Sequence, residues 1–559
     1  MTLSMCLTAL WGGTEKLASD LRNYKQAGEV DVIVQYRNAP AEAHHQKVAA
    51  KGGALRHRLD LIRATHYRVP VTALSDLAND PDIAYISPDR PVQGQLDSAE
   101  PAINANWAFS NGYNGNGITV AVIDSGISSG PDVFGSRILY NQSFVSSALY
   151  DPTDRFGHGT HVAGIIAGTG ADSTGSYFTK TFRGIAPGVS LVNLRVLDGN
   201  GAGTDSAVIA AIQEAIAVKS IYNIRVINLS LGRPVFESYK IDPLCQAVEA
   251  AWKAGIVVVV AAGNQGRNNS ANTNGYGTIM APGNDPSVIT VGAAKDMGTI
   301  TRTDDLMASY SSKGPTLIDH VVKPDVVAPG NRIIASLPIS IAMTTTYPGN
   351  RPLLSYYEPG GSGSSTDYFM LSGTSMATPM VSGTAALMLQ KDSSLTPDTV
   401  KARLMKTASK TFPAASTRTV PSSSTTTDTS TGTSITYTTY YDLFTIGAGY
   451  IDAEAALNDT GTVPANNNSN SPAVTANSSG AVQMVMGTNV IWGSNVIWGS
   501  NVIWGSSLLS GANVIWGSNV VWGSSTTSGF NVIWGSNAIW GSSTSDATEA
   551  TTLLIAGEK

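Results

Sequence analysis

Cysteine is almost absent from this chain: its 559 residues include only Cys6 and Cys245. Two cysteines cannot build the disulfide framework that holds small secreted domains together. Long apolar runs are also absent, and none reaches the ~18 consecutive residues that a membrane-spanning helix needs. The chain must therefore be held together by hydrophobic cores, and its length predicts about three or four domains.

Positive charge is scarce as well. Lys and Arg number 35 against 41 Asp and Glu, which gives a net charge of −6. No basic patch indicates a nucleic-acid partner, and no block of like charge indicates an interaction tail. Charge disappears altogether from residues 460–545, which contain no Asp, Glu, Lys or Arg. That part of the chain therefore differs in kind from the rest.

The N-terminal residues divide into two parts. Residues 1–27 form a leader of unclear nature: Leu3–Trp11 is mostly apolar, but no basic residue precedes it and no clear small-residue cleavage site follows. Residues 28–95 contain a small α+β unit in which short strands and helices alternate. The expected strands are Val30–Tyr36 and Ile83–Ile86, and the expected helices are Ala41–Ala50 and Val71–Ala78.

Residues 96–458 form one large domain in which apolar strands alternate with helices. This pattern is typical of a parallel α/β sheet that helices cover on both faces. The expected strands are Ile118–Ile123, Leu191–Val196, Val226–Leu229, Ile256–Ala262 and Val288–Val291, and the expected helices include Thr204–Val218 and Leu244–Lys253. The Ser/Thr-rich run Ala414–Thr439 interrupts the pattern and predicts a mobile surface insertion.

A hexapeptide repeat of the form Asn-Val-Ile-Trp-Gly-Ser occupies residues 483–542, between an expected linker at 459–482 and a tail at 543–559. Glycine recurs at every sixth position from Gly487 to Gly541. Three adjacent strand-forming residues per hexad favour a β-solenoid, for which hexads are a known period, over a disordered tract; both alternatives remain open. An outward Trp face would bind polysaccharide, a cell surface or another copy of the chain.

The most informative segment is Gly373-Thr374-Ser375-Met376-Ala377-Thr378-Pro379. It places Ser375 at the mouth of an apolar helix predicted over Met376–Leu389. A serine in that position has an exposed hydroxyl and an unpaired backbone N–H, as a nucleophile beside an oxyanion site requires. Taken alone, such a serine is more often only a helix N-cap.

Three further segments supply what this serine needs. Asp124 closes an apolar strand in Val120-Ala121-Val122-Ile123-Asp124, His158 begins a helix in Gly157-His158-Gly159-Thr160-His161, and Asn264 ends Ala261-Ala262-Gly263-Asn264. His158 can act as a base, Asp124 can hold its imidazole, and Asn264 can donate to an oxyanion together with the Ser375 N–H. His158 and His161 could instead ligate a metal, but no further ligand follows at zinc-site spacing.

With Asp, His and Ser in this order, the chain resembles the subtilisin-like serine peptidases over roughly residues 100–458. The resemblance implies a serine endopeptidase that hydrolyses extended polypeptides through an acyl-enzyme. Weaker matches are Ser230-Leu231-Gly232, Ala281-Pro282-Gly283, Ala308-Ser309-Tyr310-Ser311-Ser312, Val327-Ala328-Pro329-Gly330 and Ile446-Gly447-Ala448-Gly449-Tyr450.

The resemblance also implies a substrate cleft. Gly201-Ala202-Gly203 and Ser230-Leu231-Gly232 match the two edges between which the family lays a peptide strand, so that backbone hydrogen bonds give affinity. Ala261 and Met280 match the pocket for the residue just before the scissile bond. Met280 stands where many relatives carry glycine, so we expect very large aromatic residues to fit less well in that pocket.

The resemblance further identifies residues 28–95 as an inhibitory propeptide with a ferredoxin-like fold, removed by cleavage between about 93 and 100. We therefore expect a self-processing zymogen that is secreted or held at the cell surface. Its chemistry would need no cofactor. Structural calcium is possible but not indicated, because Asp132 alone does not make a calcium site and the Asn-rich calcium loop of some relatives is missing.

Rival functions fit less well. A sedolisin-type acid peptidase would carry Glu in place of His158. A lipase or esterase would need Gly-x-Ser-x-Gly, and Ala377 replaces the second glycine. The remaining alternative is a surface-binding or adhesin protein built on the Trp repeats, with a secondary proteolytic role, although no triad member is missing.

Overall fold

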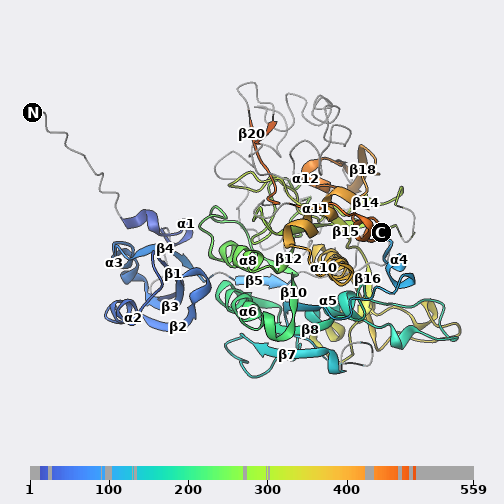
Figure 1. Ribbon diagram of the computed structural model, residues 1–559, viewed down its shortest axis with the longest axis horizontal. Coiled ribbons are helices and arrows are strands. Elements are labelled where there is room, and N and C mark those ends of the chain that lie inside the picture. Colours follow the sequence, from blue (N-terminus) through green and yellow to red (C-terminus); the bar gives the residue numbers. More distant parts are fainter. Residues whose placement is uncertain are drawn as a thin grey trace, which may run out of the picture.

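The computed structural model describes residues 13–22, 28–89, 91–94, 103–128, 130, 132, 135–267, 274–297, 299, 302–421, 434–463, 469–476 and 482–485. Of the predicted hexapeptide repeat only residues 483–485 are among them, and the predicted tail lies outside them. A small N-terminal domain lies beside a larger α/β domain (Figure 1).

The small domain is a four-stranded antiparallel sheet with two helices. Its elements are β1 (Glu29–Tyr36), α2 (Glu42–Ala49), β2 (Ala54–Leu59), η2 (Asp60–Ile62), β3 (Ala64–Pro70), η3 (Val71–Ala73), α3 (Leu74–Ala78) and β4 (Ile83–Pro88). The strand order β2-β3-β1-β4 is ferredoxin-like, as expected. Because side chains alternate along β1, Val32 and Val34 enter this domain's own core, whereas Ile33 joins the core of the large domain.

The described part of the expected leader packs onto the small domain. It forms η1 (Gly13–Lys16) and α1 (Ser19–Arg22), and Leu17 and Leu21 are buried in the domain's core. The Ala18 N–H donates to the Ile86 carbonyl at 2.9 Å. The boundary expected at residue 28 is therefore corrected: residues 13–22 are an integral part of the small domain, because their apolar side chains are covered only there.

Seven strands of the large domain pair in parallel, in the order β15-β13-β12-β10-β6-β8-β7, and the short β14 pairs antiparallel with β13. They are β6 (Thr119–Asp124), β7 (Ile138–Ser143), β8 (Ser190–Arg195), β10 (Ile224–Leu229), β12 (Val257–Ala261), β13 (Ile289–Lys295), β14 (Leu306–Met307) and β15 (Val326–Pro329). Every residue of β6 and β12 is buried. This confirms the covered parallel sheet that the apolar runs predict.

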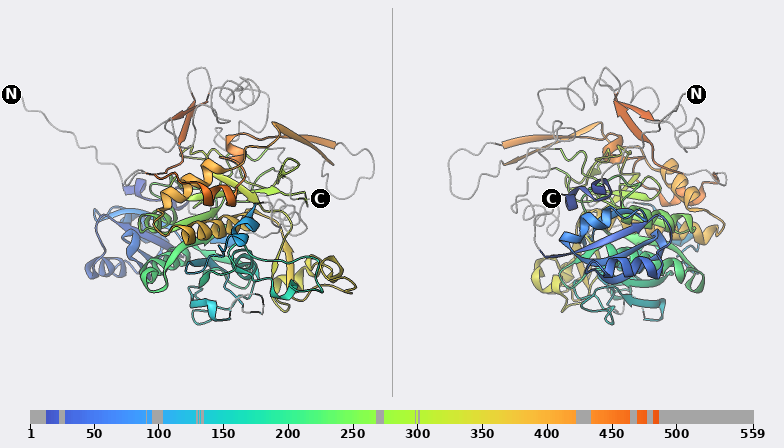
Figure 2. Two further views of the ribbon diagram at one scale, coloured as in Figure 1. Left: turned by 45° about the vertical axis from the view of Figure 1, so that its right-hand side comes forward. Right: turned by 90° about the vertical axis from the view of Figure 1, so that its left-hand side faces the viewer.

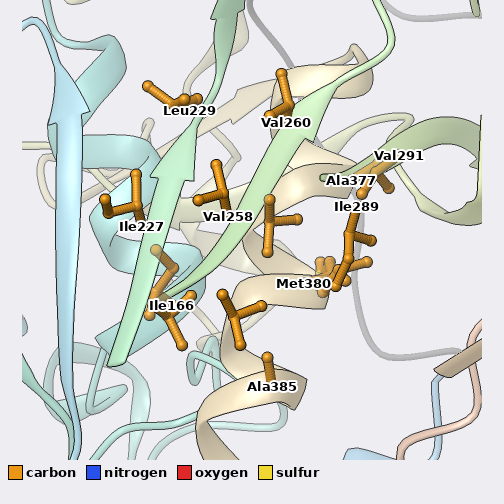
Figure 3. Close-up of a cluster of buried hydrophobic side chains, with 14 of the residues drawn as sticks. Ile166, Ile227, Leu229, Val258, Val260, Ile289, Val291, Ala377, Met380 and Ala385 are labelled. Carbon is orange, nitrogen blue, oxygen red and sulfur yellow. The ribbon is translucent and has the colours of Figure 1, made fainter. Parts of the chain in front are cut away.

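Helices cover both faces of this sheet. On one face lie α5 (His158–Ala167) and α10 (Thr374–Lys391), and Figure 3 shows Met380 of α10 and Ile166 of α5 behind Val258 and the other strand residues. On the other face lie α6 (Asp205–Ala217) and α8 (Pro243–Lys253), next to the small domain (Figures 1 and 2). Further helices of this domain are α4 (Ala105–Ser110), α7 (Lys219–Tyr222), α11 (Pro397–Thr407), α12 (Leu443–Ile446) and α13 (Ala453–Asn458), with η4 (Gly135–Arg137) and η5 (Ala171–Ser173).

A long excursion separates the paired strands β16 (Ile333–Ser336) and β17 (Tyr368–Leu371). It contains α9 (Ala342–Thr346), η6 (Pro348–Asn350) and η7 (Leu354–Tyr356). A separate aromatic core of Phe182, Tyr357 and Tyr368 holds it to the body, with ring centroids of neighbouring pairs 4.8–5.7 Å apart. The excursion is therefore a packed element of the large domain.

The run predicted as a mobile insertion forms a regular hairpin in its described parts. β18 (Ala415–Pro421) pairs antiparallel with β19 (Ser434–Tyr440), and the hairpin stands out from the body (Figure 2). Thr, Ile, Val and Tyr fill these strands, and such residues favour extended backbone. A high Ser/Thr content therefore concealed a strand pattern.

The expected linker at 459–482 is docked in part on the large domain. Ser469 donates to Asp398 through both its N–H and its hydroxyl, each at 2.7 Å. Ser471 bonds the Asp325 carboxylate and lies 3.0 Å from the Lys401 ammonium, and all three side chains are buried. Beyond it, β20 (Ala473–Ala476) pairs with β21 (Val482–Val485), and Val474 is buried. The large domain therefore extends past the predicted boundary at 458.

We predict that a chain ending at residue 463 unfolds at a lower temperature than one ending at residue 485. The shorter chain loses the burial of Val474 and leaves the buried Lys401 and Asp325 without Ser471, which together cost about 3 kcal/mol or more. Differential scanning calorimetry of the two chains measures the difference. Equal midpoints would show that residues 469–485 add nothing to the fold.

Candidate active site

Asp124 and His158 are brought together by the end of a strand and the start of a helix. Asp124 is the last residue of β6 and His158 is the first of α5. His158 Nδ1 lies 2.6 Å from Asp124 Oδ1, and neither side chain is exposed. Because the carboxylate accepts a hydrogen bond from the Nδ1–H group, the other ring nitrogen, Nε2, is left as the basic atom.

Ser375 lies in the first turn of α10, where it exchanges two hydrogen bonds with Ser230. The Ser375 hydroxyl donates to the Ser230 carbonyl at 3.1 Å, and the Ser230 hydroxyl donates to the Ser375 carbonyl at 2.7 Å. A helix would normally satisfy the Ser375 carbonyl with the N–H four residues on, but that residue is Pro379, which has none. Ser230 takes the place of the missing donor.

Asn264 follows β12 and faces the residue before Ser375. Its Oδ1 accepts from the Thr374 N–H at 2.9 Å and from the Thr374 hydroxyl at 3.0 Å. Since both donors bind the oxygen, the orientation of the amide is fixed, and its Nδ2 group points the other way as a donor. Asn264 is thus held beside the start of α10.

The carboxyl end of the parallel sheet gathers these residues, as expected for an α/β site. His161 joins α5 to β17, the strand just before α10: its Nε2 lies 3.0 Å from the carbonyl of Phe369. Burial lowers the pKa of His161 to about 3, so its ring is neutral. Within the described ranges, no group of three or more His, Cys, Asp or Glu side chains could hold a metal ion. Histidine therefore has a structural role at position 161.

Asp132, the one oxygen ligand considered for calcium, is bonded within the protein. Its Oδ1 accepts from the Thr169 hydroxyl and the Ala171 N–H, both at 2.9 Å. These contacts fasten the turn after α5.

The two predicted cleft edges flank an extended strand. β5 (Pro91–Gly94), which leaves the small domain, runs antiparallel between β9 (Ala202–Thr204) and β11 (Leu231–Gly232) (Figure 1). Gly203 pairs with Val92 and Gly232 pairs with Gln93. Gly201 has a φ of 76°, and a Cβ there would lie 2.5 Å from the Phe156 ring, so only glycine fits. The groove therefore accepts a peptide backbone by strand addition.

Met280 lies at the foot of these edges and is buried. Its N–H donates to Ala262 at 3.0 Å, next to Ala261, the last residue of β12. A Cβ on Gly263 would lie 2.7 Å from the Met280 sulfur, and one on Gly232 would lie 3.2 Å from its Cβ. The methionine side chain therefore fills the space between Gly232 on β11 and Gly263 just after β12.

The sequence pattern does not identify Arg233, although this residue anchors the cleft. Its buried guanidinium lies 2.9 Å from Asp205, the first residue of α6, and 2.8 Å from Asp242, the N-cap of α8. Burial opposes the charge, but the two carboxylates hold the pKa of Arg233 well above its usual value. An isolated arginine in a loop carries no motif, so only the fold shows that it ties the β11 edge to both helices.

No helix in the described part of the chain is long and apolar enough to cross a membrane.

Known proteins match this chain over most of its length. The model of the subtilase family matches residues 115–436. Serine protease AprX of Bacillus subtilis (strain 168) is 36% identical over 407 residues, covering 70% of this chain and 84% of that protein. Subtilisin E of the same organism is 35% identical over 393 residues, covering 69% and 87%.

A solved structure supports the fold. The crystal structure of fervidolysin from Fervidobacterium pennivorans, described as a keratinolytic enzyme related to subtilisin, aligns with a TM-score of 0.57, over 85% of this chain and 68% of that one. The two are 21% identical, so this likeness concerns the fold alone. With the sequence matches beside it, the conclusion is plain: this chain belongs to the subtilase family and is a serine endopeptidase.

Proposed function

We propose that this endopeptidase hydrolyses extended polypeptides with Asp124, His158 and Ser375 as its catalytic triad and Asn264 as an oxyanion donor. The observation that carries the proposal is the buried 2.6 Å contact between His158 and Asp124. It fixes the imidazole at the start of α5 with Nε2 as its basic atom. Gly201, Ala202, Gly203, Ser230, Leu231, Gly232, Ala261 and Met280 are proposed to bind the substrate.

In the proposed reaction, His158 Nε2 takes the proton from the Ser375 hydroxyl as its oxygen attacks the peptide carbonyl. The oxyanion of the tetrahedral intermediate accepts hydrogen bonds from Asn264 Nδ2 and the Ser375 N–H. The imidazolium, stabilised by Asp124, then protonates the leaving amine. Water hydrolyses the acyl-enzyme with His158 again as the base. These groups supply nucleophile, base and oxyanion donors, so we propose that the chemistry needs no cofactor.

We predict that Ser375→Ala abolishes casein hydrolysis, because no other group in the site can form the acyl-enzyme. Asn264→Ala should lower kcat by about 10²–10³, since one oxyanion donor is lost. The matched control is Thr384→Val on the same helix, where the hydroxyl donates to the Met380 carbonyl of that helix at 2.9 Å. That variant should keep its kcat. Casein hydrolysis by purified Ser375→Ala would refute the proposed triad.

We further propose that the small domain inhibits the enzyme by filling its cleft with β5. Hydrogen bonds hold this domain to α6 and to the residues just before α8. Asp89 accepts from the Ser206 N–H at 2.6 Å, Gln35 donates to Ile241 at 3.1 Å, and the Leu61 N–H donates to Gln213 at 3.1 Å. The backbone pairing of β5 would exclude any substrate strand from the same edges. A zymogen that must remove this domain follows from the arrangement.

The register of β5 predicts the processing site. Gly94 pairs with Leu231, and the preceding enzyme residue, Ser230, holds the Ser375 hydroxyl. The bond after the next propeptide residue, Gln95, should therefore be cut, although Gln95 itself lies outside the described residues. Intact mass and N-terminal sequencing of active enzyme should show a mature chain beginning at Leu96, and Ser375→Ala should stay uncut. Active enzyme that starts near residue 30 would contradict the inhibitory role.

We predict that Met280 limits the size of the residue before the scissile bond. Met280→Gly removes the side chain that fills the space beside Gly263, so kcat/KM for cleavage after Phe should rise relative to Ala by roughly tenfold or more. A peptide library assayed with both enzymes measures the ratio. If the unaltered enzyme cleaves equally well after Phe, Leu and Ala, Met280 does not restrict the pocket.

Apart from residues 483–485 in β21, the repeat at 483–542 lies outside the described residues. Its solenoid fold, its contact with polysaccharide or a cell surface, and the adhesin alternative remain predictions, as does the secreted or cell-surface location. The docked segment 469–476 supports one proposal about it: the repeat is attached to the large domain through a packed anchor.

A further inference from the structure

A buried carboxylate outside the triad lies between the two elements that carry Asp124 and His158. Asp154 precedes His158 by four residues and is almost fully buried. Its Oδ1 accepts from the Ser125 hydroxyl at 2.9 Å and from the N–H groups of Phe156 and Gly157 at 3.0 and 2.7 Å. Its Oδ2 accepts from the Thr160 N–H at 2.9 Å and the Thr160 hydroxyl at 2.7 Å. Both oxygens are therefore fully used within the protein.

These bonds join the residue after Asp124 to the residues around His158. The Ser125 N–H donates to Asp124 Oδ1 at 2.7 Å, while the Ser125 hydroxyl accepts from the Gly159 N–H at 2.9 Å. The backbones touch here as well, because a Cβ on Gly159 would lie 2.3 Å from the Gly126 carbonyl oxygen. The spacing of the Asp124 and His158 side chains is thus set by a junction that Asp154 holds closed.

Asp154 also supplies charge at this junction. His158 is the first residue of the ten-residue helix α5, whose N-terminus carries about half a positive charge and so disfavours an imidazolium. Asp154 accepts two backbone N–H groups of that helix start, from Gly157 and Thr160. Burial raises the pKa of Asp154, but backbone N–H groups can only donate, and they favour the ionised form. A carboxylate on the helix end offsets its positive potential.

We propose that Asp154 is a positioning residue for catalysis, which holds His158 against Asp124 and offsets the positive end of α5 so that the imidazolium can form. This inference rests on the proposed triad.

Few other charged groups face His158. His161, on the same helix, is neutral because burial lowers its pKa to about 3. Arg155 is exposed and pairs with Asp151 at 2.9 Å. The buried Arg195, which is paired with Asp124 between β8 and β6, donates to the Leu197 and Asp151 carbonyls at 3.1 and 2.8 Å. The neighbouring β16 and β17 contain no charged residue, and α10 has only Lys391, at its far end. Asp124 and Asp154 are therefore the two anions that dominate the electrostatics of this imidazole among the described residues.

Asp154→Asn tests the proposal, since it keeps the size of the side chain but removes the charge and one acceptor atom. We expect kcat to fall by roughly tenfold to a hundredfold with KM little changed, because the reacting groups are misplaced rather than the substrate. Removing an anion near His158 lowers the pKa of its imidazolium. The acidic limb of the kcat/KM profile should therefore move to lower pH, by roughly half a unit or more.

Two further variants separate positioning from general destabilisation. Asp442→Asn removes another buried helix-capping carboxylate, which accepts from the Phe444 and Thr445 N–H groups and from the Tyr276 hydroxyl. It should lower the unfolding temperature and leave the pH profile in place. Ser125→Ala removes one arm of the junction with less risk to folding, so it should lower kcat on its own. In the double variant, the fold loss of kcat should be smaller than the product of the losses in Ser125→Ala and Asp154→Asn.

A wild-type kcat and acidic limb in folded Asp154→Asn would overturn the proposal. A loss of activity in Asp154→Asn that only matches its loss of folded protein, as in Asp442→Asn, would also overturn it. If Asp154→Asn does not fold, a wild-type kcat in Ser125→Ala would overturn the proposal instead. Such results with an inactive Ser375→Ala leave the triad standing and remove only the role of Asp154. Casein hydrolysis by Ser375→Ala would instead remove the triad on which this inference rests.

Discussion

A single contact between two fully buried side chains, Asp124 and His158, is the constraint on which the rest of the large domain depends. A carboxylate placed in a protein interior is costly unless donors surround it. Here the end of β6 and the start of α5 provide two donors to Oδ1, the Ser125 N–H and the imidazole itself. That arrangement requires the carboxyl end of β6 to lie beside the N-terminus of α5. The covered parallel sheet brings these two ends together.

The start of α10 meets a similar requirement in a different way. Pro379 leaves the Ser375 carbonyl without a helical partner, and the Ser230 hydroxyl at the cleft edge donates to that carbonyl instead. The bond that completes the helix therefore also fixes Ser375, the proposed nucleophile, next to the proposed substrate-binding edge at Ser230. Arg233 then ties this edge to the N-termini of α6 and α8. Stability and site geometry depend on the same few contacts in this region.

The small domain uses both faces of its sheet, and this explains how it can be both a folded unit and a partner of the enzyme. One face of β1 buries Val32 and Val34 beneath its own helices, while Ile33 on the other face packs with the large domain. Its last strand, β5, then continues into the cleft as the middle strand of a three-stranded sheet. A strand that completes the two edges by backbone pairing fits the role of an occupant that must later be cut away.

The sequence by itself determined the apolar strands and helices, the order of Asp124, His158, Asn264 and Ser375, and both cleft edges, because each rests on a local pattern of neighbouring residues. Tertiary structure alone decided what depends on residues distant in the chain. Asp154 acquires its place from Ser125, twenty-nine residues away, and Arg233 from Asp205 and Asp242. The leader and linker boundaries shifted for the same reason: Leu17 and Ser471 are recognisable as structural residues only where Ile86, Asp325 and Lys401 cover them.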